Sequence, residues 1–367
     1  MPKVDFHALA NTSIRDLTPY QPGKPIEELE RELGITSSIK LASNENPLGP
    51  SQQVILTAQE ALQKAHFYPD GGCYELKHTL AKFLSVAPEQ ITVGNGSENV
   101  LELIVKAYLH QDDTAVISQY AFLTIPILIK SYGTHAKVVP AQDWGHDING
   151  MINAIDNKTR VLFLVNPNNP TGTYTSDSNF QHLMDSVPPH VLVVVDEAYS
   201  EYISNEDYPD TLKYLSRYPN LVITRTFSKV YGLAALRLGY SISSPDIADI
   251  LNRSRLPFNV NTIAAKAACA ALSDQEHVKN SVTLNTEGMK QLEHGLQKLN
   301  LDYIPSIGNF ISVDVNDAAT VYQKLLYEGV IVRPLKAYGM PNHIRVTIGT
   351  AQQNDRFLSS MEKILRT

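Results

Sequence analysis

The sequence predicts an α/β protein with two unequal parts. The larger part is expected to be a three-layer α/β/α domain around a mostly parallel sheet, because aliphatic runs at 161–165 and 191–195 alternate with segments of helical periodicity. Uniformly apolar strands are typical of a parallel sheet that is covered by helices on both faces. After about residue 260, long helical patterns lead instead to strands of alternating polarity, which indicates a smaller α+β domain.

The length of 367 residues also favours one large and one small domain. Residues 1–25 are polar and punctuated by proline, so we expect an extended N-terminal arm. We assign residues 26–50 and 261–367 to the small domain and residues 51–260 to the large domain.

Helices and strands follow one another in a regular order. In the first 62 residues we expect a helix over 26–33 that ends at Gly34, a short strand over 39–42, and a helix from about Val54. The other expected strands are 91–93, 114–117, 138–139, 161–165, 191–195, 221–223, 309–313, 329–333 and 343–347, and the clearest later helices are 263–272 and 278–299.

Composition excludes several classes of function. A net charge of −7 gives no basis for binding nucleic acid or an anionic membrane surface. The two cysteines, Cys73 and Cys269, form no disulfide framework, and no Cys/His cluster predicts a metal site. The sequence shows neither a secretory leader pattern nor an apolar run of membrane-spanning length. We therefore expect a soluble cytoplasmic protein.

Residues that follow the first two large-domain strands suggest an anion site and an aromatic contact. The segment Gly94-Asn95-Gly96-Ser97-Glu98 lets the backbone approach an anion at a helix N-terminus, although Ser97 as a simple N-cap is equally consistent. Tyr120 follows the next strand and is either a core aromatic residue or a ring that stacks on a planar ligand.

The next two strand ends carry amide and carboxylate groups. The heptapeptide 166–172 (Asn-Pro-Asn-Asn-Pro-Thr-Gly) predicts a rigid loop that aims an amide side chain. Asp196 ends a five-residue aliphatic run, where a carboxylate is costly unless it is paired with a cation, and Tyr199 follows three residues later. Asp196 could also be only a helix N-cap.

The strand over 221–223 leads to the segment around which these groups gather. Lys229 lies among apolar neighbours, so its amine loses a proton more easily and can form a Schiff base with a carbonyl. Ser228 and Arg237 offer a hydroxyl and a guanidinium group that suit a phosphate. Together the strand ends specify a planar, phosphorylated aldehyde with a ring nitrogen, which describes pyridoxal 5′-phosphate (PLP).

With these motifs the sequence resembles the fold-type-I, class II PLP-dependent aminotransferases, and most closely the histidinol-phosphate aminotransferase family. The resemblance covers nearly the whole chain. It rests on residues 41–50, 68–72, 166–172 and 196–199, on Ser228 and Lys229 through Arg237, and on Arg333 and Arg345.

The resemblance implies a role for each site residue. Lys229 would form the Schiff base and move the proton, Asp196 would keep the pyridine nitrogen protonated, and Tyr199 and Asn169 would bind the ring oxygen. Tyr120 would stack on the ring. The other implied cofactor contacts are Gly96, Ser97, Glu98, Ser228 and Arg237, with Tyr68 from the second subunit of a homodimer. The implied substrate contacts are Tyr20, Asn44, Arg333 and Arg345.

The implied reaction is transamination between L-histidinol phosphate and 2-oxoglutarate, a step of histidine biosynthesis. Two departures weaken the substrate assignment: a tyrosine that many relatives carry a few residues after the stacking ring is replaced within Thr124-Ile125-Pro126, and Ala235 stands where a glycine is usual. Only the first bears on the substrate side of the pocket. An aromatic amino-acid aminotransferase and a threonine-phosphate decarboxylase therefore remain alternatives.

Overall fold

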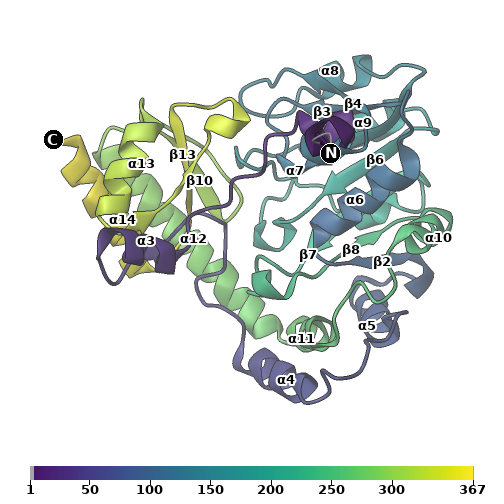
Figure 1. Ribbon diagram of the computed structural model, residues 1–367, viewed down its shortest axis with the longest axis horizontal. Helices are drawn as coiled ribbons and strands as arrows, with labels where there is room; N and C mark the ends of the chain where they lie inside the picture. Colours follow the sequence, from purple (N-terminus) through teal and green to yellow (C-terminus); the bar gives the residue numbers. More distant parts are fainter. Residues whose placement is uncertain (1–3, 367) are drawn as a thin grey trace.

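The computed structural model describes residues 4–366 and has two lobes (Figure 1). The large lobe is built on a seven-stranded sheet of order β2-β8-β7-β6-β5-β3-β4, in which β8 is antiparallel to both of its neighbours and β3 to β7 are parallel. Its strands are β2 (Ile91–Gly94), β3 (Thr114–Ser118), β4 (His135–Val139), β5 (Thr159–Val165), β6 (Leu192–Asp196), β7 (Leu221–Thr226) and β8 (Gly239–Ile242).

Two apolar cores lie on opposite faces of this sheet, which confirms the expected three layers. Side chains alternate along each strand, so Val193 and Val195 enter one core while Leu192 and Val194 enter the other. One face is covered by α4 (Gln52–Leu62), α5 (Tyr74–Leu84), α8 (Ile148–Asn153), α9 (Asp177–Ser186) and α11 (Thr262–Ser273). The other is covered by α6 (Ser97–Tyr108), α7 (Thr124–Ser131) and α10 (Pro245–Ser254).

The small lobe holds a four-stranded antiparallel sheet and a separate parallel pair. The sheet has the order β12 (Arg333–Pro334), β13 (His343–Thr347), β10 (Phe310–Asp314) and β9 (Tyr303–Ile304), and the pair is β1 (Ile39–Lys40) with β11 (Val330–Ile331). Its helices are α3 (Ile26–Leu33), α12 (Gln275–Lys298), α13 (Ala318–Tyr327) and α14 (Ala351–Leu365). Gly34 ends α3 in the left-handed conformation, as expected.

The lobes meet at a different residue from the expected boundary at 261. Helix α11 packs on α4 and α5, and buried alanines such as Ala264, Ala267 and Ala268 belong to the large-lobe core. These small side chains let α11 approach α4 and α5 closely, and this packing assigns α11 to the large lobe. The C-terminal part of the small lobe begins within α12, whose later residues Met289, Leu292 and Leu296 belong to the small-lobe core. The change in pattern near residue 260 marks longer helices, not the change of lobe.

The N-terminal arm connects both lobes (Figure 1). It contains two single-turn helices, α1 (Phe6–Leu9) and α2 (Thr12–Arg15), where we expected extended chain, because Asp5 and Asn11 cap them. The Ser13 hydroxyl donates to the carbonyl oxygen of Ser131 on α7, and the carbonyl oxygen of Gln21 accepts a hydrogen bond from Arg333 of β12.

Short 3-10 helices complete the chain: η1 (Pro88–Gln90), η2 (Ser200–Tyr202), η3 (Thr211–Tyr214), η4 (Ala234–Leu236) and η5 (Lys336–Tyr338). Within residues 4–366, none of the helices combines the length and apolar character needed to cross a membrane.

Candidate active site

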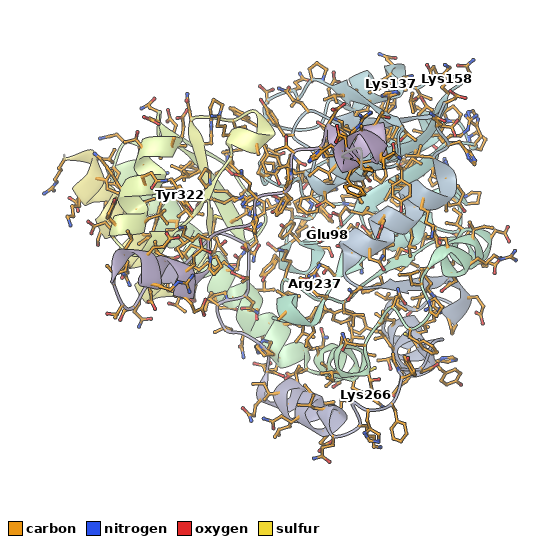
Figure 2. The ribbon with its side chains drawn as sticks, in the orientation of Figure 1. Glu98, Lys137, Lys158, Arg237, Lys266 and Tyr322 are labelled. Atoms are coloured by element: carbon orange, nitrogen blue, oxygen red, sulfur yellow. The ribbon has the colours of Figure 1, made fainter. Side chains whose placement is uncertain are left out.

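The carboxyl ends of β5, β6 and β7 open into a cavity of about 740 Å³ that is continuous with solvent. Figure 2 shows Glu98 and Arg237, two of its lining residues, near the middle of the molecule. Eight of the residues chosen from sequence line it: Ser97, Glu98, Asn169, Asp196, Tyr199, Ser228, Lys229 and Arg237. The polar groups that follow separate strands are therefore brought to one place, as a parallel sheet requires.

Lys229 is the central cation of this cavity. Its Nζ donates a hydrogen bond of 3.0 Å to the carbonyl oxygen of Ser43, which belongs to the chain segment that enters from the small lobe. Burial lowers the pKa of Lys229 to about 8, and the nearby positive charge of Arg345 acts in the same direction. About a tenth of this side chain is thus a neutral amine at pH 7, far more than for an ordinary lysine.

Asp196 is the buried anion at the end of β6. Removal from water raises the pKa of its carboxyl group to about 6, and a 2.9 Å hydrogen bond from the Thr224 hydroxyl opposes that rise. A carboxylate in such a position is stabilised by a cationic partner, so it is suited to a protonated ring nitrogen.

A hydrogen-bonded network joins the large lobe to the small one beside Lys229. The Tyr199 hydroxyl oxygen accepts from Asn44 Nδ2 at 2.9 Å and from Asn169 Nδ2 at 3.2 Å. Asn169 Oδ1 accepts from Arg345, whose Nη2 donates to the carbonyl oxygen of Ala42 at 2.9 Å. Burial raises the pKa of Tyr199 well above its ordinary value, so its hydroxyl keeps its proton.

An anion cradle occupies the edge formed by the start of α6 and the segment after β7. Arg237 Nη1 lies 3.3 Å from the Ser228 hydroxyl, and Arg237 Nη2 lies 3.3 Å from Glu98 Oε2. Gly96 has a φ of +90°, and a Cβ placed on it would lie 2.5 Å from Arg237 Nη2. The glycine therefore leaves the space in which the guanidinium group lies beside the free N–H groups of the helix.

Arg333 lies in β12, an edge strand of the small-lobe sheet. It pairs with Arg345 in the register of β12 and β13, and both arginines are buried. The Arg333 guanidinium carbon lies 5.1 Å from the centre of the Tyr20 ring, and Tyr20 is half exposed. These three predicted substrate residues thus meet where the N-terminal arm crosses between the lobes.

Seven residues chosen from sequence do not line this cavity. Five of them, Gly96, Tyr20, Asn44, Arg333 and Arg345, take part in the contacts described above, and the other two, Tyr68 and Tyr120, lie elsewhere. Tyr68 is 83% exposed and stacks on Phe258 at 4.9 Å between ring centres. Tyr120 is not among the described residues that line the cavity; it packs beside Leu335 and Tyr338, and its ring centre lies 5.5 Å from that of Trp144.

The aromatic residue that does line the cavity is Phe122, two positions later. The expectation that Tyr120 is the ring in this site is therefore not met by the geometry. Strand β3 ends at Ser118, and the chain needs a turn at 119–121 before α7 to bring a side chain into the cavity. Sequence reasoning also missed other lining residues, namely Ser43, Glu45, Val165, Ala198, Thr226 and Ala234.

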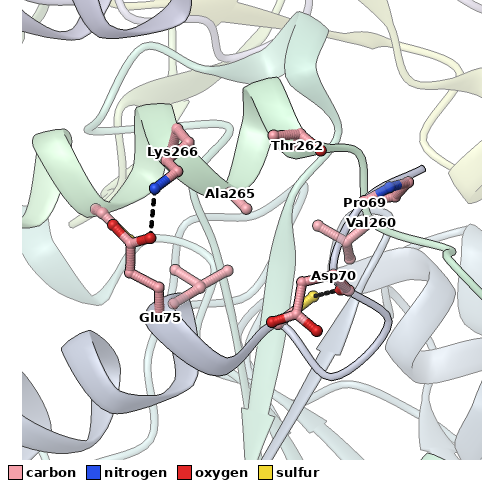
Figure 3. Close-up of a pocket in the computed structure, with 10 residues that line it drawn as sticks. Pro69, Asp70, Glu75, Val260, Thr262, Ala265 and Lys266 are labelled. Carbon is pink, nitrogen blue, oxygen red and sulfur yellow. Dashed lines mark hydrogen bonds and ion pairs between the residues drawn. The ribbon is translucent and has the colours of Figure 1, made fainter. Parts of the chain in front are cut away.

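A second, smaller cavity of about 400 Å³ lies between α5, α11 and the loop that precedes α5 (Figure 3). It contains the Lys266–Glu75 ion pair and both cysteines, of which Cys73 donates to the carbonyl oxygen of Asp70 at 3.6 Å. In the part of the chain that the structure describes, no cluster of His, Cys, Asp and Glu could hold a metal ion.

Comparison with known families decides the class of the protein. Residues 36–361 match the family model "Aminotransferase class I and II". The chain belongs to this family. Two curated relatives of this aminotransferase are similar over almost their whole lengths. "Histidinol-phosphate aminotransferase 2" of Pseudomonas fluorescens is 53% identical over 364 residues, which are 98% of each chain. The protein of the same name from Pseudomonas aeruginosa is 51% identical, over 98% of this chain and 99% of that one.

Solved structures agree with the fold. Histidinol-phosphate aminotransferase from Sinorhizobium meliloti, solved in complex with PLP, has a TM-score of 0.89 and 27% identity, with 97% of each chain covered. Thermus thermophilus aspartate aminotransferase, at 20% identity and a TM-score of 0.84, covers 97% of this chain and 99% of that one, and it shows the shared fold alone.

The cavity of this aminotransferase fits PLP, the cofactor of the family. The buried Lys229 amine suits an aldehyde, the desolvated Asp196 carboxylate suits a protonated ring nitrogen, and the cradle of Gly96 and Arg237 suits a phosphate.

The lowered pKa of Lys229 predicts how PLP binding depends on pH. Only the neutral amine attacks a carbonyl, so the rate at which PLP binds the cofactor-free protein should rise with pH and level off above a midpoint at about 8. Stopped-flow absorbance measures this rate, and the exposed Lys158→Ala variant is the control. A midpoint near 10.5, the ordinary lysine value, would contradict the desolvated setting of Lys229.

Proposed function

We propose that this aminotransferase transfers the amino group of L-histidinol phosphate to 2-oxoglutarate, giving imidazole acetol phosphate and glutamate, as a step of histidine biosynthesis. The names of the curated relatives that are about half identical over nearly the full chain support this assignment. The structural observation that supports it most is the buried pair Arg333 and Arg345, since two guanidinium groups suit a substrate phosphate and the charge of Arg345 acts on Lys229.

PLP supplies a carbonyl carbon that takes up the amino group and a ring that withdraws electrons from the substrate Cα. Gly96, Ser97, Ser228 and Arg237 would bind its phosphate, and Glu98 would orient Arg237 through the ion pair between them. Phe122, in place of Tyr120, is the ring that we assign to the face of the cofactor, because it lines the cavity.

Lys229, Asp196 and Tyr199 would be the catalytic residues. The neutral Nζ of Lys229 takes the proton from the substrate Cα, which its lowered pKa favours near neutral pH. The Asp196 carboxylate holds the proton on the ring nitrogen by charge pairing. Tyr199 and Asn169, already joined by a hydrogen bond, would bind the oxygen of the ring.

The substrate would lie between the lobes. Arg345 would bind the carboxylate of glutamate or the phosphate of histidinol phosphate, and Arg333 with Tyr20 would assist with the phosphate. Asn44 would orient the substrate side of the site through its hydrogen bond to Tyr199. The N-terminal arm supplies Tyr20 and, at Gln21, a carbonyl group that holds Arg333 in place.

We also propose a cytoplasmic homodimer in which Tyr68 of one subunit reaches the cofactor phosphate of the other. Large apolar side chains are exposed together around the loop that precedes α5, including Phe67, Tyr68, Leu256 and Phe258. A contiguous exposed apolar patch is typical of a protein interface.

Light scattering should therefore give twice the 40.7 kDa mass of the chain. A mass of one chain at micromolar concentration would contradict the shared site.

A panel of amino donors with 2-oxoglutarate tests the substrate assignment. We expect kcat/KM for histidinol phosphate to exceed that for phenylalanine or tyrosine by at least about 100-fold, because donors without phosphate leave two buried guanidinium groups bonded to neutral acceptors and without an anionic partner among the described residues. Glutamate formation measures the rate for each donor.

The variant Arg333→Met should lose most of this preference, whereas the matched exposed control Arg253→Met should keep it. Faster turnover of phenylalanine or tyrosine would favour an aromatic amino-acid aminotransferase. Release of carbon dioxide from O-phosphothreonine without an acceptor would favour a decarboxylase. Either result would overturn the proposal.

A further inference from the structure

One of the two carboxylate oxygens of Asp196, Oδ1, accepts a hydrogen bond from a neighbouring strand of the sheet. Asp196 lies opposite Thr224 in the parallel register of β6 and β7, and the Thr224 hydroxyl donates to Asp196 Oδ1 at 2.9 Å. Thr224 is fully buried, and Asp196 is 4% exposed. Because a carboxylate oxygen can only accept, the direction of this bond is fixed while Asp196 is ionised.

The second oxygen, Oδ2, is left for the cavity. None of the described residues donates a hydrogen bond to it, and it is not among their fully sealed polar atoms without a partner. Since Asp196 also lines the cavity, Oδ2 is the carboxylate oxygen that retains access to a bound ligand.

A second pair on the opposite face of the sheet holds the two strands in this register. Glu197 and Arg225 follow Asp196 and Thr224, and their side chains form an ion pair of 2.9 Å. Glu197 Oε1 also accepts from the Thr211 hydroxyl at 2.6 Å, and the Glu197 N–H donates to the carbonyl oxygen of Thr224. Side chains alternate between faces of a sheet, so this network keeps Thr224 beside Asp196 without entering the cavity.

Charges from several elements act on the same carboxyl group. Burial is the largest influence that favours its neutral form, and Glu98 of α6 and Glu197 add to it. The Thr224 hydroxyl and the Lys229 ammonium favour the ionised form. Tyr199 and Tyr208 also face this region, but burial raises the pKa of both phenols, so they stay neutral near neutral pH.

We propose that Thr224 is a positioning residue, whose hydroxyl fixes Oδ1 so that the ionised Asp196 presents Oδ2 to the ring nitrogen of PLP. The inference rests on the proposed function, because it requires PLP in this cavity. Thr224 touches neither cofactor nor substrate; it acts through the orientation and ionisation of Asp196.

The test compares the PLP dissociation constants of four variants with that of the wild type between about pH 6 and pH 8.5. Asp196→Asn removes the carboxylate itself. Thr224→Val removes the hydroxyl with little change in shape, and Thr224→Ser keeps it. Thr92→Val is the matched control, since Thr92 of β2 is also fully buried in the same sheet and donates its hydroxyl to the carbonyl oxygen of Ala248.

Loss of the donor raises the pKa of Asp196, so the carboxyl group of Thr224→Val is neutralised first as the pH falls. If the pKa rises by one unit from about 6, the ionised fraction at pH 6 falls from about one half to about one eleventh. The dissociation constant of Thr224→Val relative to wild type should thus be largest near pH 6, at about fivefold, and shrink toward pH 8.5. Thr224→Ser and Thr92→Val should follow the wild type, and melting temperatures report folding separately.

The outcomes separate this inference from the proposed function. Wild type that binds no PLP would remove the proposed function itself. If wild type binds PLP and Asp196→Asn weakens it, but Thr224→Val follows the wild type at every pH, the positioning role is wrong. An equal, pH-dependent weakening in Thr92→Val would also overturn it, because the effect would then belong to any buried hydroxyl of the sheet.

Discussion

The removal of Lys229 and Asp196 from water is the constraint on which the site depends. Each group loses hydration that its charged form requires, and the pKa values move toward each other, to about 8 for the lysine and about 6 for the aspartate. The hydrogen bonds that the structure gives these two side chains go to neutral groups, the Ser43 carbonyl for Lys229 and the Thr224 hydroxyl for Asp196. An aldehyde can react with the Lys229 amine, and a protonated ring nitrogen can pair with the Asp196 carboxylate. PLP carries both groups, so this arrangement suits its chemistry.

The rest of the chain maintains that desolvation. The sheet supplies Asp196 and the segment after β7, but the small lobe closes the site with the Ser43 carbonyl group and with Arg345, which acts on the pKa of Lys229 and binds Asn169. Groups from both lobes therefore set the charge state of Lys229 together. The position of Arg333 depends in turn on the N-terminal arm, because the Gln21 carbonyl oxygen accepts a hydrogen bond from its guanidinium group.

Sequence reasoning reached the parts that regular structure determines. Uniform aliphatic strands predict a covered parallel sheet, and its carboxyl ends must meet, so Asp196 and Lys229 could be placed together. Strand β8 was missed because Gly239 and Ser241 interrupt its run of apolar residues. Phe122 could not be distinguished from Tyr120, since the turn after β3 decides which ring enters. Thr224 was hidden because its role depends on the register between strands that are far apart in sequence.

Borohydride reduction of the PLP-loaded protein, followed by peptide mass spectrometry, tests the central claim most directly. Reduction fixes the cofactor to the amine that holds its carbonyl carbon. The desolvated amine at the end of β7 predicts that the phosphopyridoxyl mass lies on Lys229, and that Lys229→Ala carries none. Labelling of another lysine, with Lys229 unmodified, would contradict the account.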